Sequence, residues 1–264
     1  MAINAKDFTF CDKKLSDFGF MIADFDNSLD ESASCGNVEL ITTRPPMSAN
    51  NIVHGISYGD PIKLDFQIVK FDFANCICSE TPVTNEEQEN LMRWLIKRNY
   101  NYIYFDDDIY LCFNVHMNVT PKKVGGVIRG FQITATNDSV YSYSVGRAMS
   151  LNNGENLFTD ESSVVGYMYP SFRIVADASG DVVVEHKEDD RKMVISNCLP
   201  GEELLIDCKH KTIKSNVAAH NLSSDFNFVF TRLFNTEETR ENTIIVTNSR
   251  YATMFYRFNR MVVI

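Results

Sequence analysis

The most regular pattern of apolar side chains in this chain is helical. Leu91, Trp94 and Leu95 recur at the spacing of one face of an α-helix. Upstream of them, Thr84 and Glu87 form a capping box, in which each side chain binds a backbone N–H group at the start of a helix. Acidic residues crowd the first turns and basic residues crowd the last, which suits the helix macrodipole. The sequence therefore predicts a stable amphipathic helix.

This helix is expected to run from about Asn85 to Arg98, and strand patterns surround it. Tyr100 to Phe105 and Ile109 to Val115 are rich in β-forming residues, and the acidic turn Asp106 to Asp108 separates them. Other strands are expected at Phe8–Phe10, Leu15–Ile22, Val38–Thr43, Pro61–Val69 and Val127–Thr136. The first half is thus predicted to be a β domain with one helix.

Three segments of the first half are predicted to be exposed. Asp26 to Asn37 is a polar loop, and Met47 to Gly59 is mostly polar and is not expected to join a core. Pro121 to Gly126 is expected to be the tip of a hairpin.

The character of the sequence changes between Asn137 and Asn156, where Ser, Asn, Gly and Tyr dominate. We interpret this stretch as a segment that connects two domains, residues 1–143 and 144–264. Beyond it the pattern predicts β-structure without a helix, with turns at the spacing expected of a β-sandwich. The expected strands are Ser171–Val175, Asp181–Glu185, Lys192–Ser196, Glu203–Asp207, Thr212–Ser215, Phe226–Phe234, Asn242–Val246 and Thr253–Ile264.

Composition narrows the classes of function. The net charge of −10 and the lack of any basic run argue against a surface that binds duplex DNA. The chain has neither a signal-peptide pattern nor an apolar window of about 18 residues, so no membrane partner is expected. Seven cysteines, unevenly spread, favour free thiols in a protein made in a reducing cytoplasm.

Metal sites are weakly indicated. Cys76 and Cys78 have a metal-like spacing, but a zinc site needs about four ligands, and only His116 is near in sequence. The pattern favours a surface thiol pair. Asp106 to Asp108 lacks the alternating ligands, glycine and distant glutamate of a calcium loop, so it is interpreted as a solvated turn. No metal or cofactor is expected.

Catalytic patterns are weaker still. Glu185, His186, Asp189 and Asp190 suggest acid–base chemistry, but they are better interpreted as a solvated turn of mixed charge. No nucleophile elbow, phosphate loop or dinucleotide fingerprint occurs, so the sequence predicts no enzyme. Four tyrosines are of the type that stacks on sugar rings, although aromatic packing at a domain junction explains them more simply; they are Tyr141, Tyr143, Tyr167 and Tyr169.

Several stretches together resemble the distal tail protein (Dit) family of long-tailed, siphovirus-type bacteriophages. In the first half they are FTF…LSDFGFMI, LMRWL, YIYFDDDIYLCF and GFQITATND; in the second half they are YMYPSFRIV, GEELLIDC and NTIIV. Each piece is a loose pattern, but together they cover most of the chain. Two places depart from the family. Glu237 to Glu241 replaces a glycine-marked turn, and the loop from Asp26 to Asn37 is unusually polar.

The resemblance implies an N-terminal β domain like those of tail-tube proteins, followed by a galectin-like β-sandwich. It also implies a homohexameric ring in the virion, at the tail tip. Such a ring would join the tail tube protein to the tip or baseplate proteins and let DNA pass through its lumen without specific binding. The alternative function is a carbohydrate-binding protein that adsorbs to sugars of the host cell wall.

A ring of this kind needs a contact patch on each subunit that differs from the patch it meets on the next. We expect the loops of residues 1–143 to make that contact while the sandwich projects outward. The best candidate is the segment from Pro45 to Tyr58. Its apolar residues Met47, Ile52, Val53 and Ile56 are expected to form the interface. Each would contribute about 1–2 kcal/mol if a neighbour buried it. The alternative is a surface loop with scattered apolar residues.

Overall fold

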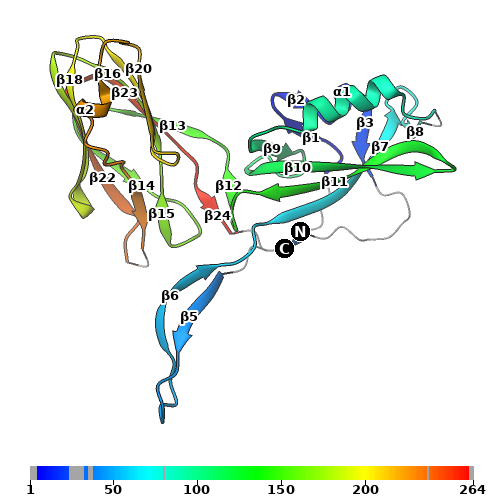
Figure 1. The fold of residues 1–264 in the computed structure, drawn as a ribbon, viewed down its shortest axis with the longest axis horizontal. Helices are drawn as coiled ribbons and strands as arrows, with labels where there is room; N and C mark the ends of the chain where they lie inside the picture. The colour runs from blue at the N-terminus through cyan, green and yellow to red at the C-terminus, as the bar shows by residue number, and fades with distance from the viewer. Residues whose placement is uncertain (1–4, 24–32, 35–37, 80, 237, 262–264) are drawn as a thin grey trace. The chain divides into compact units, whose positions relative to one another are not determined.

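The computed structural model describes residues 5–23, 33–34, 38–79, 81–236 and 238–261 (Figure 1). The chain is mainly β, as the sequence predicts, and it divides into two compact units. The first contains residues 1–143 and 260–264, and the second contains residues 144–259. In the part of the chain that the structure describes, no helix is both long and apolar enough to cross a membrane.

The first unit is built on an antiparallel sheet with the strand order β2-β1-β9-β10-β11-β7-β3, and β4 and β8 also pair with β7. These strands are β1 (Phe8–Phe10), β2 (Lys13–Lys14), β3 (Phe20–Ile22), β4 (Ala33–Ser34), β7 (Lys63–Asp72), β8 (Ile77–Cys78), β9 (Asn101–Phe105), β10 (Leu111–Val124) and β11 (Val127–Asn137). The strands β12 (Ser142–Ser144) and β24 (Asn259–Arg260) lie where the chain leaves and re-enters this unit.

Buried and more exposed side chains alternate along β7, which shows why the sheet has one buried face. Leu64, Phe66 and Ile68 are buried in the core, whereas residues 63, 65 and 67 between them are at most half-buried. Successive side chains of a strand point to opposite faces, so the apolar set falls on one side. Phe66 pairs with Ile133 and Ile68 with Phe131 of β11, which continues the core onto the next strand.

The helix α1 (Asn85–Leu95) lies against the sheet of the first unit (Figure 1). Its capping box is present: Glu87 N–H donates to Thr84 Oγ1 (3.2 Å), and Thr84 N–H donates to the Glu87 carboxylate (2.8 Å). The helix ends before the expected Arg98, because Ile96 adopts an extended backbone. Leu95 is the last residue of the apolar face in the core, and packing of that face provides most of a helix's stability.

The sequence predictions for two elements of the first unit are wrong in detail. Leu15–Phe18 forms a 3₁₀-helix (η1) instead of a strand, stabilised by the Asp17 carboxylate, which accepts from Lys14 N–H (2.9 Å). The hairpin tip expected from Pro121 is shorter, because β10 continues to Val124 and the turn uses Gly125 and Gly126, both with positive φ. Pro121 is tolerated where β9 does not reach, since proline cannot donate to a second strand.

The second unit contains antiparallel sheets with the orders β13-β23-β16-β19-β20, β14-β22-β17-β18 and β15-β21. Its strands are β13 (Arg147–Leu151), β14 (Gly154–Thr159), β15 (Gly166–Met168), β16 (Ser171–Ala176), β17 (Gly180–His186), β18 (Arg191–Cys198), β19 (Glu203–Asp207), β20 (Thr212–Ser215), β21 (Leu233–Asn235), β22 (Glu241–Thr247) and β23 (Ser249–Tyr256). Inward side chains of the two larger sheets share one hydrophobic core, as in a sandwich.

Four expectations for the second half are corrected. The polar stretch from Asn137 contains β12 and β13, because β13 pairs with β23, nearly the whole unit away in sequence. Only the end of the strand expected at Phe226–Phe234 forms, as β21, since Phe228 has a positive φ. The last expected strand is divided into β23 and β24. Helical turns also occur where none was expected: α2 (Leu222–Asp225) and the 3₁₀-helix η2 (Lys187–Asp189).

Candidate functional site

Val38–Thr43 is a strand as expected, and the mostly polar stretch from Met47 to Gly59 contains a second strand, so that the two form a β-hairpin that projects from the first unit (Figure 1). It consists of β5 (Val38–Thr43), β6 (Ile52–Tyr58) and the tip between them, and we call residues 38–58 the arm. The two strands are antiparallel, with Leu40 opposite Ile56 and Thr43 opposite Ile52. The sequence pattern of β6 is weak, because Gly55 and His54 interrupt the alternation of apolar and polar residues where the strand pairing shifts register.

The arm exposes apolar side chains on both faces. Seven of them are at least half exposed: Leu40, Ile41, Met47, Ile52, Val53, Ile56 and Tyr58. All four residues expected to form an interface are in this set, and Met47 is fully exposed. Leu40 and Ile56 lie side by side across the strands, whereas Ile41 points to the opposite face. The structure thus brings the expected residues together on one element and adds Leu40, Ile41 and Tyr58.

The arm has no layer of protein over either face in the described part of the first unit. Its two strands form a sheet of their own, in which each strand has a single partner. An isolated two-stranded hairpin is marginally stable in water, and an unpaired strand edge is a template for another chain. An element with this composition gains stability when a partner covers it.

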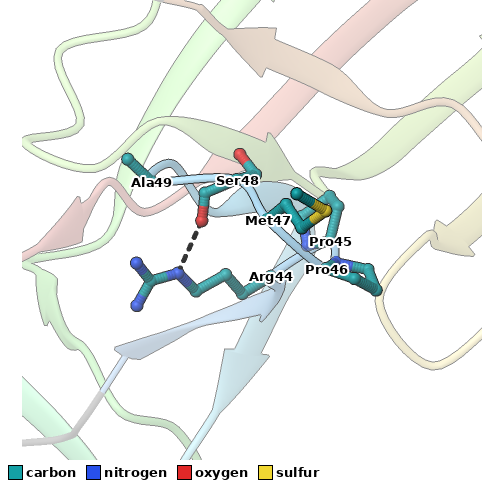
Figure 2. A pocket seen from close by; sticks show the side chains of 6 residues that line it. All are labelled: Arg44, Pro45, Pro46, Met47, Ser48 and Ala49. Carbon is teal, nitrogen blue, oxygen red and sulfur yellow. Dashed lines mark hydrogen bonds between the residues drawn. The ribbon is translucent and has the colours of Figure 1, made fainter.

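The tip of the arm forms a small, open hollow lined by residues 44–49 (Figure 2). Arg44 Nε donates to the Ser48 carbonyl (2.9 Å), and Ser48 N–H donates to the Pro45 carbonyl (3.1 Å). Met47, which has a positive φ of 65°, is among the residues that line the hollow. Thr43 Oγ1 lies 2.5 Å from His54 Nε2, which links the strands below the tip. The tip is therefore ordered by its own hydrogen bonds.

The base of the arm is attached to the body of the first unit through an aromatic pair. The rings of Tyr58 and Tyr141 meet edge to face at 6.1 Å between centroids. Burial, and to a smaller extent the neighbouring Tyr58, raises the pKa of Tyr141. The Tyr141 phenol therefore stays neutral near pH 7.

The other sites considered from the sequence have simpler structures. Cys76 and Cys78 are both exposed, next to and within the short strand β8. Asp108 Oδ1 accepts from Tyr110 N–H (2.9 Å) in the turn before β10, so this carboxylate orders the turn. The loop expected from Asp26 to Asn37 lies outside the described residues except for β4, and so does Glu237.

His186 is not part of a solvated turn; that expectation is wrong. The imidazole is fully buried at the end of β17, because η2 folds its carboxylates back over the ring. Nδ1 lies 2.7 Å from Asp189, and Nε2 lies 2.9 Å from Asn242 Oδ1 and 3.2 Å from Glu188. Glu188 also accepts from Thr243 N–H (2.9 Å). These bonds fasten η2 to β22.

The carboxylates of this network are held ionised. Burial opposes ionisation of Asp189, but bonds from His186 and Arg232 outweigh it and lower the pKa. Burial also opposes ionisation of Glu188, and its bonds to Thr243 again keep the pKa low. Every polar atom of the imidazole faces a protein group, so this is a structural network in the described chain.

The four tyrosines are not one group. Tyr141 and Tyr143 belong to the first unit, where Tyr143 is buried and its hydroxyl donates to Asp138 (2.7 Å). Tyr167 and Tyr169 belong to the second unit and are exposed. The Arg232 guanidinium lies 4.1 Å from the centre of the Tyr167 ring and occupies one of its faces. Sugar binding by these rings stays a prediction from the sequence.

The fold is that of a mainly β protein of two units, the first of which carries the arm. The family model for the phage tail protein N-terminal domain matches residues 3–139, and the model for the phage tail C-terminal domain matches residues 141–256. The chain belongs to this phage tail protein family.

A solved structure supports the same conclusion. The chain is similar to the crystal structure of Dit (gp 19.1) from phage SPP1, with a TM-score of 0.62 and 11% sequence identity. The match covers 96% of this chain and 98% of the SPP1 chain, and its title describes that protein as a paradigm of the hub adsorption apparatus in phages that infect Gram-positive hosts. At this identity the likeness concerns the fold. The resemblance to distal tail proteins is confirmed. No curated protein matches the sequence.

Proposed function

We propose that this protein is a structural hub of the phage tail tip, a homohexameric ring that joins the tail tube to the tip proteins. The observation that carries the proposal is the arm, an ordered hairpin with seven exposed apolar side chains and no covering layer in the described structure. In a closed ring, each subunit offers one patch to a different patch on the next. The arm is such a patch, and the body of a neighbouring first unit is its partner.

The charge of the protein fits passage of DNA through the ring. The chain carries a net charge of −10 and no basic run, so a lumen lined by its neutral and acidic side chains would not retain phosphates. In this arrangement the first unit forms the ring, and the galectin-like sandwich of residues 144–259 projects outward. The family and the fold of the SPP1 protein support this role.

Size-exclusion chromatography with light scattering, which measures the mass of the assembly, tests the proposal. The intact protein is expected to elute with a mass of six times 30.1 kDa. Replacing Leu40 and Ile56 by Ser should give smaller species with unchanged circular dichroism. Deleting Ser48–Ser57, which removes most of β6, should also give smaller species, with the core of the first unit intact by Trp94 fluorescence. The matched control is Leu157→Ser, which removes a more exposed apolar side chain from the second unit. A full ring formed by the arm variants, or a monomeric intact protein at every concentration, would refute the role of the arm.

A further inference from the structure

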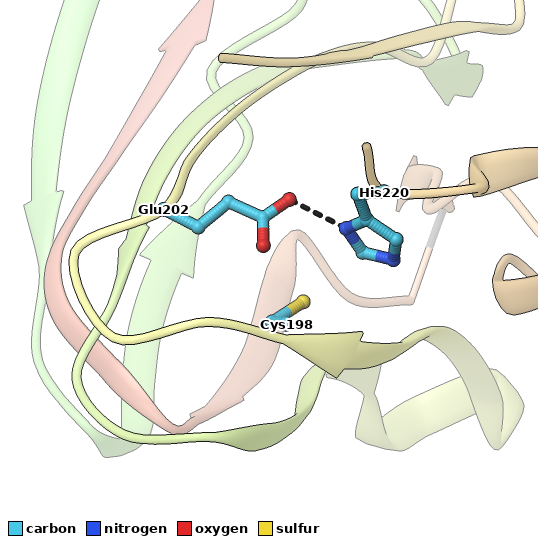
Figure 3. A group of neighbouring side chains, drawn as sticks. All are labelled: Cys198, Glu202 and His220. Atoms are coloured by element: carbon cyan, nitrogen blue, oxygen red, sulfur yellow. Dashed lines mark hydrogen bonds and ion pairs between the residues drawn. The ribbon is translucent and has the colours of Figure 1, made fainter. Parts of the chain in front are cut away.

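A second constellation lies in the second unit, far in sequence from the arm. Cys198 at the end of β18, Glu202 before β19 and His220 before α2 come together in one buried cluster (Figure 3). One ligand atom from each residue, a sulfur, a carboxylate oxygen and a ring nitrogen, lies within 4.8 Å of the other two. Sequence spacing did not reveal it, because β19 and β20 separate the histidine from the other two residues.

The three side chains are brought together by turns. Glu202 closes the turn after β18, where its N–H donates to the Leu199 carbonyl (3.0 Å) and its carboxylate accepts from Leu199 N–H (2.9 Å). Gly201, with a φ of 77°, provides the left-handed backbone that this turn needs. The Cys198, Glu202 and His220 side chains are almost completely shielded from solvent.

The hydrogen bonds of His220 orient the ring. Its Nε2 lies 3.0 Å from the Ser196 carbonyl, which only accepts hydrogen bonds, so this nitrogen carries a hydrogen. The Asp225 carboxylate lies 3.4 Å from the same nitrogen. The other nitrogen, Nδ1, therefore faces the Glu202 carboxylate at 2.5 Å. Because both of these atoms bear lone pairs, a proton must lie between them at this distance, and it is this proton that a metal ion would displace.

We propose that Cys198, Glu202 and His220 form a binding site for a divalent transition metal ion of the zinc class. Thiolate, carboxylate and imidazole are the ligands that zinc takes in proteins, whereas the sulfur disfavours calcium and magnesium. The bond from Nε2 to a backbone carbonyl is the outer-shell contact that ligating histidines usually make. Two anionic ligands and one neutral ligand balance the charge of a Zn²⁺ ion, which suits a buried site.

Binding exchanges protons for the ion. The Cys198 thiol proton and the proton between Nδ1 and Glu202 leave to solvent as the metal bonds form. Ligand atoms around a tetrahedral zinc are about 3.3–3.8 Å apart, so the histidine and the glutamate would separate by about 1 Å. A water would supply the fourth ligand, while the Ser215 hydroxyl, which donates to Glu202 Oε1 (2.5 Å), would hold the carboxylate in place. The ion would fasten the end of β18 to the loop before α2.

The test uses the full chain with Cys76 and Cys78 replaced by Ser, because this exposed pair could bind metal on its own. Added Zn²⁺ is expected to bind at one ion per chain by calorimetry and to raise the Tm. Co²⁺ in its place should give the absorption of a tetrahedral site with a thiolate-to-cobalt band. Cys198→Ser should weaken Zn²⁺ binding by at least about tenfold and abolish that band. Cys208→Ser, a buried cysteine of the same unit outside the cluster, is the matched control.

Two results would overturn the site: no stoichiometric binding by the reference protein, or unchanged binding by Cys198→Ser. His220→Gln provides an independent loss of a ligand if the cysteine variant does not fold. If neither variant folds, the cobalt spectrum of the reference protein decides, since among the described residues only this cluster places a thiol, a carboxylate and an imidazole within reach of one ion. A spectrum without the thiolate band would refute the proposal.

Discussion

The indole Nε1–H of Trp94 donates a 2.8 Å hydrogen bond to the backbone carbonyl of Phe10. This bond joins α1 to β1 across most of the first unit's sequence. The indole is also stacked on Phe18, with 4.3 Å between ring centroids, and on Phe8 at 5.6 Å. The only tryptophan of the chain is therefore the point at which the helix is fixed on the sheet.

Trp94→Ala is expected to lower the free energy of unfolding of the first unit by about 3–5 kcal/mol, because a large buried side chain is lost. Urea denaturation followed by circular dichroism measures this loss. Ile96→Ala, a half-exposed residue just after the same helix, is the control and should have a small effect. An unchanged midpoint for Trp94→Ala would contradict the packing of α1.

The capping box makes a separate prediction. Thr84→Ala removes the acceptor for Glu87 N–H and should cost about 1 kcal/mol of stability. Glu87→Ala should cost more, since its carboxylate also pairs with Lys70 at 2.8 Å. Glu86→Ala, on the exposed side of the same turn, is the control. Trp94 fluorescence during urea unfolding reports these differences in the first unit. Equal midpoints for Glu86→Ala and Glu87→Ala would contradict the cap.

The His186 network predicts how the second unit responds to acid. The folded pKa values of Asp189 and Glu188 are lowered, so their contribution to stability is complete above the unfolded pKa of about 4. It is lost as the pH falls through the folded pKa values. The free energy of unfolding should therefore change little from these groups between about pH 7 and 5, and should fall below about pH 4.

Asp189→Asn tests this assignment. The variant should lose about 1–3 kcal/mol at pH 7, because the bonds to His186 and Arg232 lose a charged acceptor, and its acid response should be flatter. Asp190→Asn, whose side chain is exposed, is the matched control. Unfolding of the second unit is the transition that circular dichroism detects and Trp94 fluorescence does not, because Trp94 lies in the first unit. A steeper fall of the free energy of unfolding with acid in Asp189→Asn would contradict the stabilising role of the ionised Asp189.

In the unassembled protein, limited proteolysis is expected to cut the arm before the stretch that joins the two units. The tip from Met47 to Asn50 is exposed backbone, whereas β12 is buried and β13 is paired with β23. Proteases cut exposed loops with few contacts first. Mass spectrometry of the fragments formed early in digestion with subtilisin gives the order in which the sites are cut. A first cut within residues 142–151 would show that this stretch is a loose connection after all.

The sequence by itself determined the elements whose pattern is local. The capping box, the apolar face of α1 and the alternation in β7 depend on neighbouring residues, so these elements were predictable. Glu203–Asp207 and Thr212–Ser215 were predicted with the bounds that the structure has, because turn residues flank them. The exposed apolar residues of the arm were also visible in the sequence, because Met47, Ile52, Val53 and Ile56 lie in an otherwise polar stretch.

Tertiary structure decided what depends on distant partners. Residues 147–151 look like a linker but form a strand because β23 offers its backbone, and backbone pairing does not depend on side-chain pattern. His186 lies among charged residues in sequence, yet Asn242 of a distant strand and the folded-back η2 bury it. The cluster of Cys198, Glu202 and His220 exists only because β19 and β20 return the chain to the same place. Contacts between residues distant in sequence are set by strand order, which no local pattern encodes.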